Sequence, residues 1–348
     1  MRLTIFKVNQ LGDNVVFLPV IQALRRFYPE WRIQLFTSSL AASLYLPASS
    51  AETFELIPTS KFLGLWKRPW SFLELLRKVR LFKPDGCLVG EDQGHVSHAL
   101  CRFSGASIRI GVRTPFLRFN PHLTVEVSPV ARLRAAAQIW EMAGHLVRRL
   151  GGQHWPLDPP APDLSSLTGY QQPIPSRVVI HPGGSDGYKR WPIERFGELA
   201  CRLAARHEVV WIESAETRTP PLPETVVKAS PPDIPSLTKM LASSSLFVGN
   251  NSGPMNLIFA LGRPAIILNG PSTEQWDPFW FPERVRMLRQ AHLHCQPCDS
   301  IERPAFVCSN QEEKFACLHR WSVDEVWNIC EEWQAKWDHL SGRRTSDV

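Results

Sequence analysis

Short apolar runs alternate with helical patterns along this chain, and the alternation constrains its fold more than any other feature. The first apolar run, Leu3–Val8, leads through a polar loop, 9–14, into a helical pattern that stops at Pro29. Repeated strand–loop–helix units of this kind imply a parallel sheet with helices on both faces. In the first half, strands are predicted over 3–8, 32–38, 86–90 and 108–112, and helices over 70–81 and 131–150.

A proline-rich segment divides the pattern into two halves. Six prolines fall within residues 151–175, a composition typical of an interdomain linker. We therefore predict an α/β fold with two Rossmann-like domains facing a central cleft, at residues 1–165 and 166–325. The helix over 326–340 is expected to pack back toward the N-terminal domain, and the tail, 341–348, is expected to be disordered. Beyond the linker, strands are predicted over 177–181, 207–212, 246–249 and 264–269, and helices over 192–205, 234–242, 253–261 and 322–340.

Composition and charge narrow the range of functions. The chain has 348 residues, of which 44% are hydrophobic and 21% charged, as expected for a folded protein. No segment reaches the roughly 18 apolar residues of a membrane span, and the start lacks the apolar core of a signal peptide, so we expect a cytoplasmic protein. Residues 1–165 contain 20 Lys or Arg and 12 Asp or Glu, a charge of +8, whereas the remainder sums to −2. The N-terminal half is therefore expected to bind an anionic partner, but not nucleic acid, because no nucleic-acid module is present.

Three loops at strand-to-helix junctions are candidate sites, because ligands of open parallel sheets bind beyond the carboxyl ends of the strands. The first loop holds Asp13. One interpretation makes Asp13 a helix N-cap that accepts backbone N–H groups, and the other makes it a general base at the floor of the cleft. The second loop, 181–192, combines three glycines with Ser185, Lys189 and a neighbouring arginine, which together suit phosphate groups. The third, 249–256, enters a helix whose first N–H groups suit a diphosphate.

Short motifs in both halves of the chain form one combination. They are Gly12-Asp13, Leu18-Pro19, Ala23–Arg26 and Pro29 in the first half, and His181-Pro182-Gly183, Lys189–Pro192, Ser252–Met255 with Leu257, Ala260–Pro264 and Gly270–Ser272 in the second. Together these residues resemble a known family, the bacterial ADP-heptose:lipopolysaccharide heptosyltransferases of glycosyltransferase family 9. The resemblance implies a GT-B architecture, in which the N-terminal domain binds mainly the acceptor and the C-terminal domain binds the nucleotide sugar. It also implies inverting, metal-independent transfer with no catalytic cofactor.

The resemblance also implies roles for individual residues. Asp13 is similar to the family's base, which deprotonates the acceptor hydroxyl as it attacks the anomeric carbon. Lys189 and Ser185 are similar to its diphosphate contacts, and Glu216 to a residue that contacts the nucleoside. The implied donor-binding residues are Gly184, Ser185, Lys189, Glu216, Asn251, Ser252, Gly253 and Asn256.

Two residues depart from the family's pattern, since Asn251 stands where Asp is usual and Asn256 where His is usual. An amide in place of a carboxylate removes a charge and adds hydrogen-bond donors. The donor, ADP-heptose, is thus an expectation from the family alone. The predicted activity is transfer of a sugar, expected to be heptose, to an anionic acceptor, a lipopolysaccharide core that is lipid-linked at the inner membrane. The alternatives are a protein or small-molecule acceptor and a non-catalytic nucleotide-sugar-binding protein.

A group of four cysteines suggests a structural metal. Cys295, Cys298, Cys308 and Cys317 can supply four thiolates to zinc or iron. In the branch of the resembled family that modifies autotransporter proteins, cysteines hold an iron. The alternative is that these are reduced cysteines packed in a loop, or a labile disulfide.

A basic, aromatic stretch in the first half has two interpretations. It comprises Trp66-Lys67-Arg68-Pro69-Trp70 and Arg77-Lys78-Val79-Arg80. One interpretation is contact with a phosphorylated lipid acceptor, which would make the protein peripheral to the inner membrane. The other is a solvated helix face that the tryptophans anchor.

Overall fold

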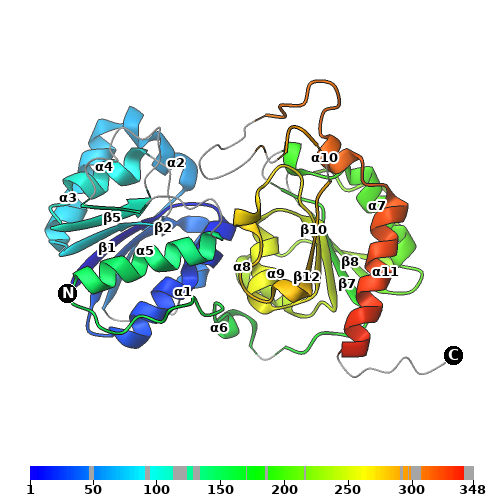
Figure 1. Ribbon diagram of the computed structural model, residues 1–348, viewed down its shortest axis with the longest axis horizontal. Coiled ribbons are helices and arrows are strands. Elements are labelled where there is room, and N and C mark those ends of the chain that lie inside the picture. Colours follow the sequence, from blue (N-terminus) through cyan, green and yellow to red (C-terminus); the bar gives the residue numbers. More distant parts are fainter. Residues whose placement is uncertain are drawn as a thin grey trace. The chain divides into compact units, whose positions relative to one another are not determined.

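The chain divides into two compact units, Met1–Asp163 and Leu164–Val348 (Figure 1). Each unit contains a parallel six-stranded sheet, which confirms the predicted α/β class. The predicted tail, 341–348, lies outside the described residues. The computed structural model describes residues 1–46, 51–90, 95–112, 124–127, 134–169, 171–184, 187–214, 217–290, 293–296, 298 and 307–340.

The N-terminal unit has the strand order β3-β2-β1-β4-β5-β6. Helices α2, α3 and α4 lie on one face of this sheet, and α1 packs against α5 on the other (Figure 1). The strands are β1 Arg2–Lys7, β2 Arg32–Ser38, β3 Glu52–Ile57, β4 Gly86–Val89, β5 Ile108–Val112 and β6 Val125–Val127. The helices are α1 Leu11–Phe27, α2 Thr59–Leu63, α3 Pro69–Phe82, α4 His95–Phe103 and α5 Ala135–Arg149, with 3-10 helices η1 Ser39–Tyr45 and η2 Gly64–Lys67.

The C-terminal unit has the strand order β12-β11-β10-β7-β8-β9. Helices α7 and α11 pack together, and α8 contacts α6 and α9. The strands are β7 Arg177–His181, β8 Glu208–Ile212, β9 Val226–Ala229, β10 Leu246–Asn250, β11 Ala265–Leu268 and β12 Val285–Leu288. The helices are α6 Ser165–Thr168, α7 Ile193–Leu203, α8 Ile234–Ala242, α9 Gly253–Leu261, α10 Ala316–His319 and α11 Val323–Leu340, with 3-10 helices η4 Gly187–Lys189, η5 Glu274–Trp276 and η6 Pro282–Arg284.

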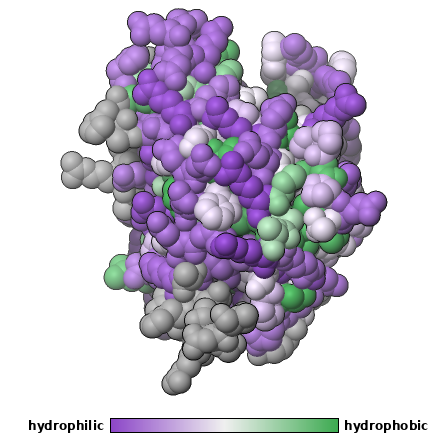
Figure 2. Space-filling view, turned by 90° about the vertical axis from the view of Figure 1, so that its right-hand side faces the viewer, coloured by the Kyte–Doolittle hydropathy of each residue, from purple (hydrophilic) through white to green (hydrophobic). Residues whose placement is uncertain are grey.

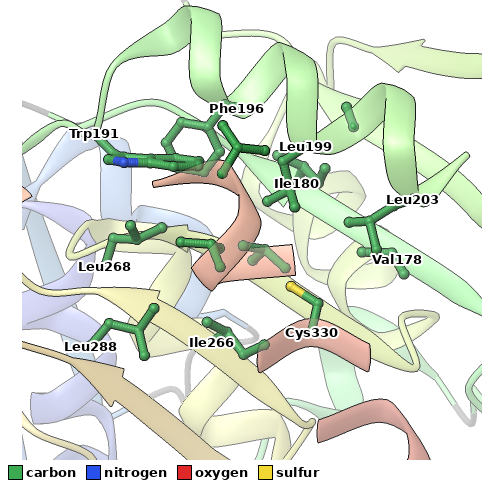
Figure 3. Close-up of a cluster of buried hydrophobic side chains, with 14 of the residues drawn as sticks. Val178, Ile180, Trp191, Phe196, Leu199, Leu203, Ile266, Leu268, Leu288 and Cys330 are labelled. Atoms are coloured by element: carbon green, nitrogen blue, oxygen red, sulfur yellow. The ribbon is translucent and has the colours of Figure 1, made fainter. Parts of the chain in front are cut away.

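The last helix, α11, belongs to the core of the C-terminal unit. We expected residues 326–340 to pack toward the N-terminal domain, but Val326 and Cys330 are buried with side chains of α7 and the sheet. Figure 3 shows Cys330 near Ile266 of β11 and below the row of α7 side chains. The apolar face of α11 thus completes the cover of its own sheet, and packing toward the N-terminal domain stays a prediction.

In each unit the first strand, β1 or β7, lies in the middle of the sheet. The next two strands extend the sheet toward one edge, and the last three extend it toward the other. The direction changes between β1 and β4 in the first sheet and between β7 and β10 in the second. Loops diverge at such a switch point and leave a crevice at the carboxyl ends of the two strands. The loops that follow these four strands are therefore the natural places for a ligand.

Surface properties agree with the sequence pattern. No helix in the described part of the chain is long and apolar enough to cross a membrane. The face of the molecule in Figure 2 is mainly hydrophilic and is interrupted by a few hydrophobic patches. Isolated patches of this kind are ordinary on folded proteins.

Candidate active site

Asp13 lies in the first turn of α1, just beyond the carboxyl end of β1. The N-cap of α1 is Gln10, which makes no side-chain cap hydrogen bond, and Asp13 is the third residue of the helix. The interpretation of Asp13 as the N-cap is therefore wrong, because the helix begins at Leu11, ahead of it. The side chain is half-buried. The positive end of the helix dipole favours a carboxylate at this position.

The next residue, Asn14, is fully buried and fixes the loop between β1 and α1. Its Nδ2 donates to the backbone carbonyls of Asn9 at 3.1 Å and Gln10 at 2.8 Å. Its Oδ1 accepts from the hydroxyls of Tyr45 at 2.7 Å and Thr37 at 3.1 Å. One amide thus ties the loop to β2 and η1. The sequence analysis missed Asn14, although an amide amid the apolar pattern of the helix was a usable signal.

A buried lysine, Lys7, ends β1 at the same edge of the sheet. It is fully buried, and its Nζ lies 5.8 Å from the centroid of the Phe17 ring, within the range of a cation–π contact. A Cβ added at Gly90, just after β4, would come within 2.8 Å of that ring and 3.2 Å of Lys7 Cδ. Glycine at that position therefore leaves room for the lysine. Because burying an ammonium is costly, its place at the switch point suggests a role in the site. Sequence analysis did not identify it.

In the C-terminal unit, Asn250 holds the second candidate loop against the end of β10. Its side chain is fully buried. Its Nδ2 donates to the carbonyls of Pro182 at 2.8 Å and Gly183 at 3.3 Å, and its Oδ1 accepts from the backbone N–H of Trp191 at 3.0 Å. Both ends of the loop over 182–191 are thus fixed by one amide. Sequence analysis singled out its neighbour instead and missed this residue.

The third candidate loop opens helix α9. Its N-cap is Ser252, which makes no side-chain cap hydrogen bond, and Pro254 occupies the first turn, as predicted. The Ser252 hydroxyl lies 3.4 Å from Nδ1 of His181, the last residue of β7. Asn256 is half-buried and its Nδ2 lies 3.5 Å from the Ser252 carbonyl. The first-turn N–H groups of such a helix, with the positive end of its dipole, can bind an anion.

The second candidate loop, residues 182–191, contains glycines and cationic side chains. Gly183 is required, because a Cβ there would come within 2.6 Å of Ser214 Oγ and 2.8 Å of His181 Nε2. The loop is braced by Arg190, whose Nε donates to the carbonyl of Gly184 at 2.8 Å. Lys189 is half-buried in η4, with its Nζ 5.5 Å from the centroid of the Tyr188 ring.

The structure brings together some of the predicted donor residues. Register places Gly249 of β10 beside His181 of β7, so the Ser252 and Gly253 helix start lies next to the loop that bears Gly184 and Lys189. Two predicted contacts, Ser185 and Glu216, lie outside the described residues.

Comparison with known proteins identifies the second unit. No curated protein sequence matches the chain significantly. Residues 164–306, however, match the model of glycosyltransferase family 9 (heptosyltransferase). The chain carries a glycosyltransferase family 9 domain. It is accordingly a glycosyltransferase, and the predicted resemblance to the heptosyltransferase family is confirmed.

Solved structures confirm the GT-B fold over nearly the whole chain. Escherichia coli heptosyltransferase WaaC, bound to ADP-2-deoxy-2-fluoro heptose, has 16% sequence identity and a TM-score of 0.67, over 95% of this chain and 99% of that one. E. coli ADP-heptose lipopolysaccharide heptosyltransferase II has 18% identity and a TM-score of 0.66, over 97% and 99%. The iron-containing dodecameric glycosyltransferase TibC of enterotoxigenic E. coli has 15% identity and a TM-score of 0.59, over 96% and 76%.

One departure within the family 9 domain, Asn251, lies beside another amide side chain. The side-chain amides of Asn251 and the buried Asn269, just after β11, lie 2.9 Å apart. Asn269 is better oriented with its oxygen accepting from the Arg289 guanidinium and its NH2 group facing Asn251. Asn251 thus contacts a polar partner at the end of β11, and this contact does not explain why an amide replaces the aspartate.

The four cysteines, of which Cys295 and Cys298 fall within the family 9 match and Cys308 and Cys317 beyond it, interact electrostatically. Burial, followed by the charges of Cys298, Cys308 and Cys295, raises the pKa of Cys317 to about 12. The Cys308 sulfur also accepts from the backbone N–H of Phe315 at 3.3 Å. All four cysteines lie within the described residues, and among those residues no three His, Cys, Asp or Glu side chains are arranged to hold a metal. Thiolates have the right chemistry for zinc or iron, and metal ligation by this group stays a prediction.

Proposed function

We propose that this glycosyltransferase moves a heptose from ADP-heptose to a hydroxyl of an anionic acceptor, with inversion at the anomeric carbon. The observation that carries the proposal is the position of Asp13. Asp13 does not serve as the N-cap of α1, and the hydrogen bonds of the buried Asn14 amide fix the turn that bears Asp13. A carboxylate held in this way can take the proton of the attacking hydroxyl.

The leaving ADP needs positive charge and N–H donors on the other side of the reaction. In the proposal, Lys189 and the α9 start at Ser252 and Gly253 bind the diphosphate, together with Gly184, Ser185, Asn251 and Asn256. Glu216 contacts the nucleoside. An immobile set of donors of this kind stabilises a departing anion without reorganising during the reaction. We therefore propose transfer without a catalytic metal, which predicts full activity in the presence of EDTA.

The proposed acceptor is a lipopolysaccharide core, reached in the cytoplasm at the inner membrane. The charge of +8 over residues 1–165 supports an anionic acceptor on the N-terminal unit. Transfer to a protein is the second candidate, which the cysteine group and the likeness to iron-containing TibC favour. If the four cysteines bind zinc or iron, that metal would supply a structural cross-link in a loop far from any catalytic role.

The test measures nucleoside diphosphate released from ADP-heptose and from UDP-sugars, with lipopolysaccharide-core and protein acceptors offered separately. We expect ADP release only with ADP-heptose and a core acceptor, and loss of at least about a hundredfold in rate for Asp13→Asn. Glu30→Gln, the same change at an exposed carboxylate beyond the far end of α1, is the matched control and should keep full activity. Donor binding without turnover by any acceptor would instead favour a non-catalytic binding protein.

Lys189 can be tested separately by nucleotide affinity. A charged hydrogen bond contributes about 1.5–3 kcal/mol, so Lys189→Ala should weaken ADP binding by about ten- to a hundredfold. Lys228→Ala, at an exposed lysine of β9, is the control. Equal ADP affinities of the two variants would contradict the assignment of Lys189 to the diphosphate.

A further inference from the structure

Many of the exposed hydrophobic side chains fall in one short stretch of the N-terminal unit. Of the fourteen large hydrophobic residues that are exposed among those described, six fall between residues 56 and 81. The two tryptophans are exposed to 71% and 82%. We name these six, which lie on β3, α2, η2 and α3, the tryptophan surface: Leu56, Leu63, Trp66, Trp70, Leu73 and Leu81.

Helix α3 has hydrophobic residues on two opposite faces. The inner face buries Leu76 and Val79 in the core, with other apolar side chains packed alongside. The outer face carries Trp70, Leu73 and Leu81 at spacings of three and eight, which place them on one side of a helix of 3.6 residues per turn. Folding of the unit accounts for the inner face only. The outer stripe, which extends over roughly 16 Å of helix at 1.5 Å per residue, therefore needs another explanation.

Positive charge surrounds these side chains. Residues 59–83 contain seven Lys or Arg and a single acidic residue. All of the seven except Lys78 are exposed. The Lys67 Nζ lies 4.8 Å from the centroid of the Trp66 ring, so cation and aromatic ring occupy the same site. Exposed tryptophans and leucines next to cations, here on neighbouring short helices, are typical of segments that lie in a membrane interface.

We propose that the tryptophan surface docks the protein on an anionic phospholipid bilayer. The tryptophan and leucine side chains would enter the headgroup region, and the lysine and arginine side chains would contact lipid phosphates. This inference rests on the proposed function in one respect, because membrane binding would bring the enzyme to a lipid-linked acceptor. Binding to vesicles can be measured without donor or acceptor, so its outcome does not depend on turnover.

The experiment measures co-sedimentation of the full chain with vesicles of phosphatidylethanolamine and phosphatidylglycerol. We expect binding at low salt that weakens as salt rises, and little binding to pure phosphatidylcholine vesicles. The double variant Trp66→Ser/Trp70→Ser should lose at least about tenfold in vesicle affinity, as should Lys67→Glu/Arg68→Glu. Both variants change exposed residues, and an unchanged melting temperature checks that they fold.

Two control variants test whether vesicle binding depends on the tryptophan surface or on any exposed hydrophobic or cationic side chain. Leu157→Ser removes a 93% exposed leucine elsewhere in the same unit, and Lys228→Glu reverses an exposed lysine of the other unit. Both should bind vesicles like the wild type. Absence of wild-type binding to the anionic vesicles, or equal binding by the tryptophan variant, would overturn the proposal. The proposal would also be overturned if the wild type bound single-stranded RNA but not vesicles, and the same variants lost that RNA binding.

Discussion

Replacing Asn14 by alanine tests whether the buried amide network holds the turn that bears Asp13. The substitution removes four hydrogen bonds, two donated to the loop carbonyls of Asn9 and Gln10 and two accepted from Tyr45 and Thr37. Each bond contributes about 0.5–1.5 kcal/mol, and a buried hydroxyl left without its acceptor costs about 1–3 kcal/mol. Because the Tyr45 hydroxyl also lies 3.5 Å from the Asn14 backbone carbonyl, some of this loss is recovered. We expect the free energy of unfolding to fall by about 3 kcal/mol.

The assay combines thermal unfolding with steady-state kinetics. A loss of about 3 kcal/mol should lower the Tm by about 6–12 °C in a unit of this size. Burial raises the pKa of Tyr45 well above its ordinary value, so its hydroxyl stays protonated and remains a donor. Tyr45→Phe should therefore cost about 1 kcal/mol alone and much less in the Asn14→Ala background. At a temperature where Asn14→Ala is folded, kcat should fall while ADP affinity is unchanged.

Two results would refute this reasoning. One is a Tm and a kcat for Asn14→Ala that equal those of the wild type. The other is strict additivity of the Asn14 and Tyr45 substitutions, because residues that share a hydrogen bond must show coupling.

Three further predictions concern the C-terminal unit. Asn250→Ala should weaken ADP binding by more than tenfold, since it frees both ends of the 182–191 loop, and calorimetry would measure the change. Ser322→Ala should cost about 1 kcal/mol near neutral pH, because Ser322 and Glu325 form a reciprocal capping box at α11. Hydrogen bonds from Ser322 lower the pKa of Glu325, so this contribution is present above the unfolded value of about 4.3 and is lost as pH falls through the folded pKa, which unfolding at several pH values would detect. Cys201, which is exposed, should react with a thiol reagent in the native protein, whereas Cys330, whose thiol pKa burial raises, should react only on unfolding, as mass spectrometry would show.

The sequence predicted the central strands and missed the edges. Among the described strands, those over 32–38, 108–112 and 177–181 match their predicted ranges. The four strands that were missed, β3, β6, β9 and β12, are the edge strands of the two sheets. An edge strand has one neighbour and an incompletely buried side, so it tolerates charged residues such as Lys228 in Val226–Ala229 and loses the apolar pattern of a central strand.

Prediction of the site had a similar limit. The turn around Gly12 and Asp13 and the α9 start at Ser252 could be placed because strand, turn residue and helix start follow one another in the sequence. The residues that brace these turns, Asn14 and Asn250, could not be assigned. Their partners, such as Tyr45 and Pro182, are distant along the chain, and only the folded sheet brings them within hydrogen-bond distance.

The most direct test of the account is the single-turnover rate of heptose transfer by Asp13→Asn under saturating ADP-heptose and acceptor. Because saturation removes differences in binding, this rate reports the step in which the acceptor hydroxyl loses its proton. A general base contributes about a hundredfold to ten-thousandfold, so the rate should fall by at least about two orders of magnitude while the affinity for ADP stays that of the wild type. A rate within a few-fold of the wild type would mean that another group takes the proton.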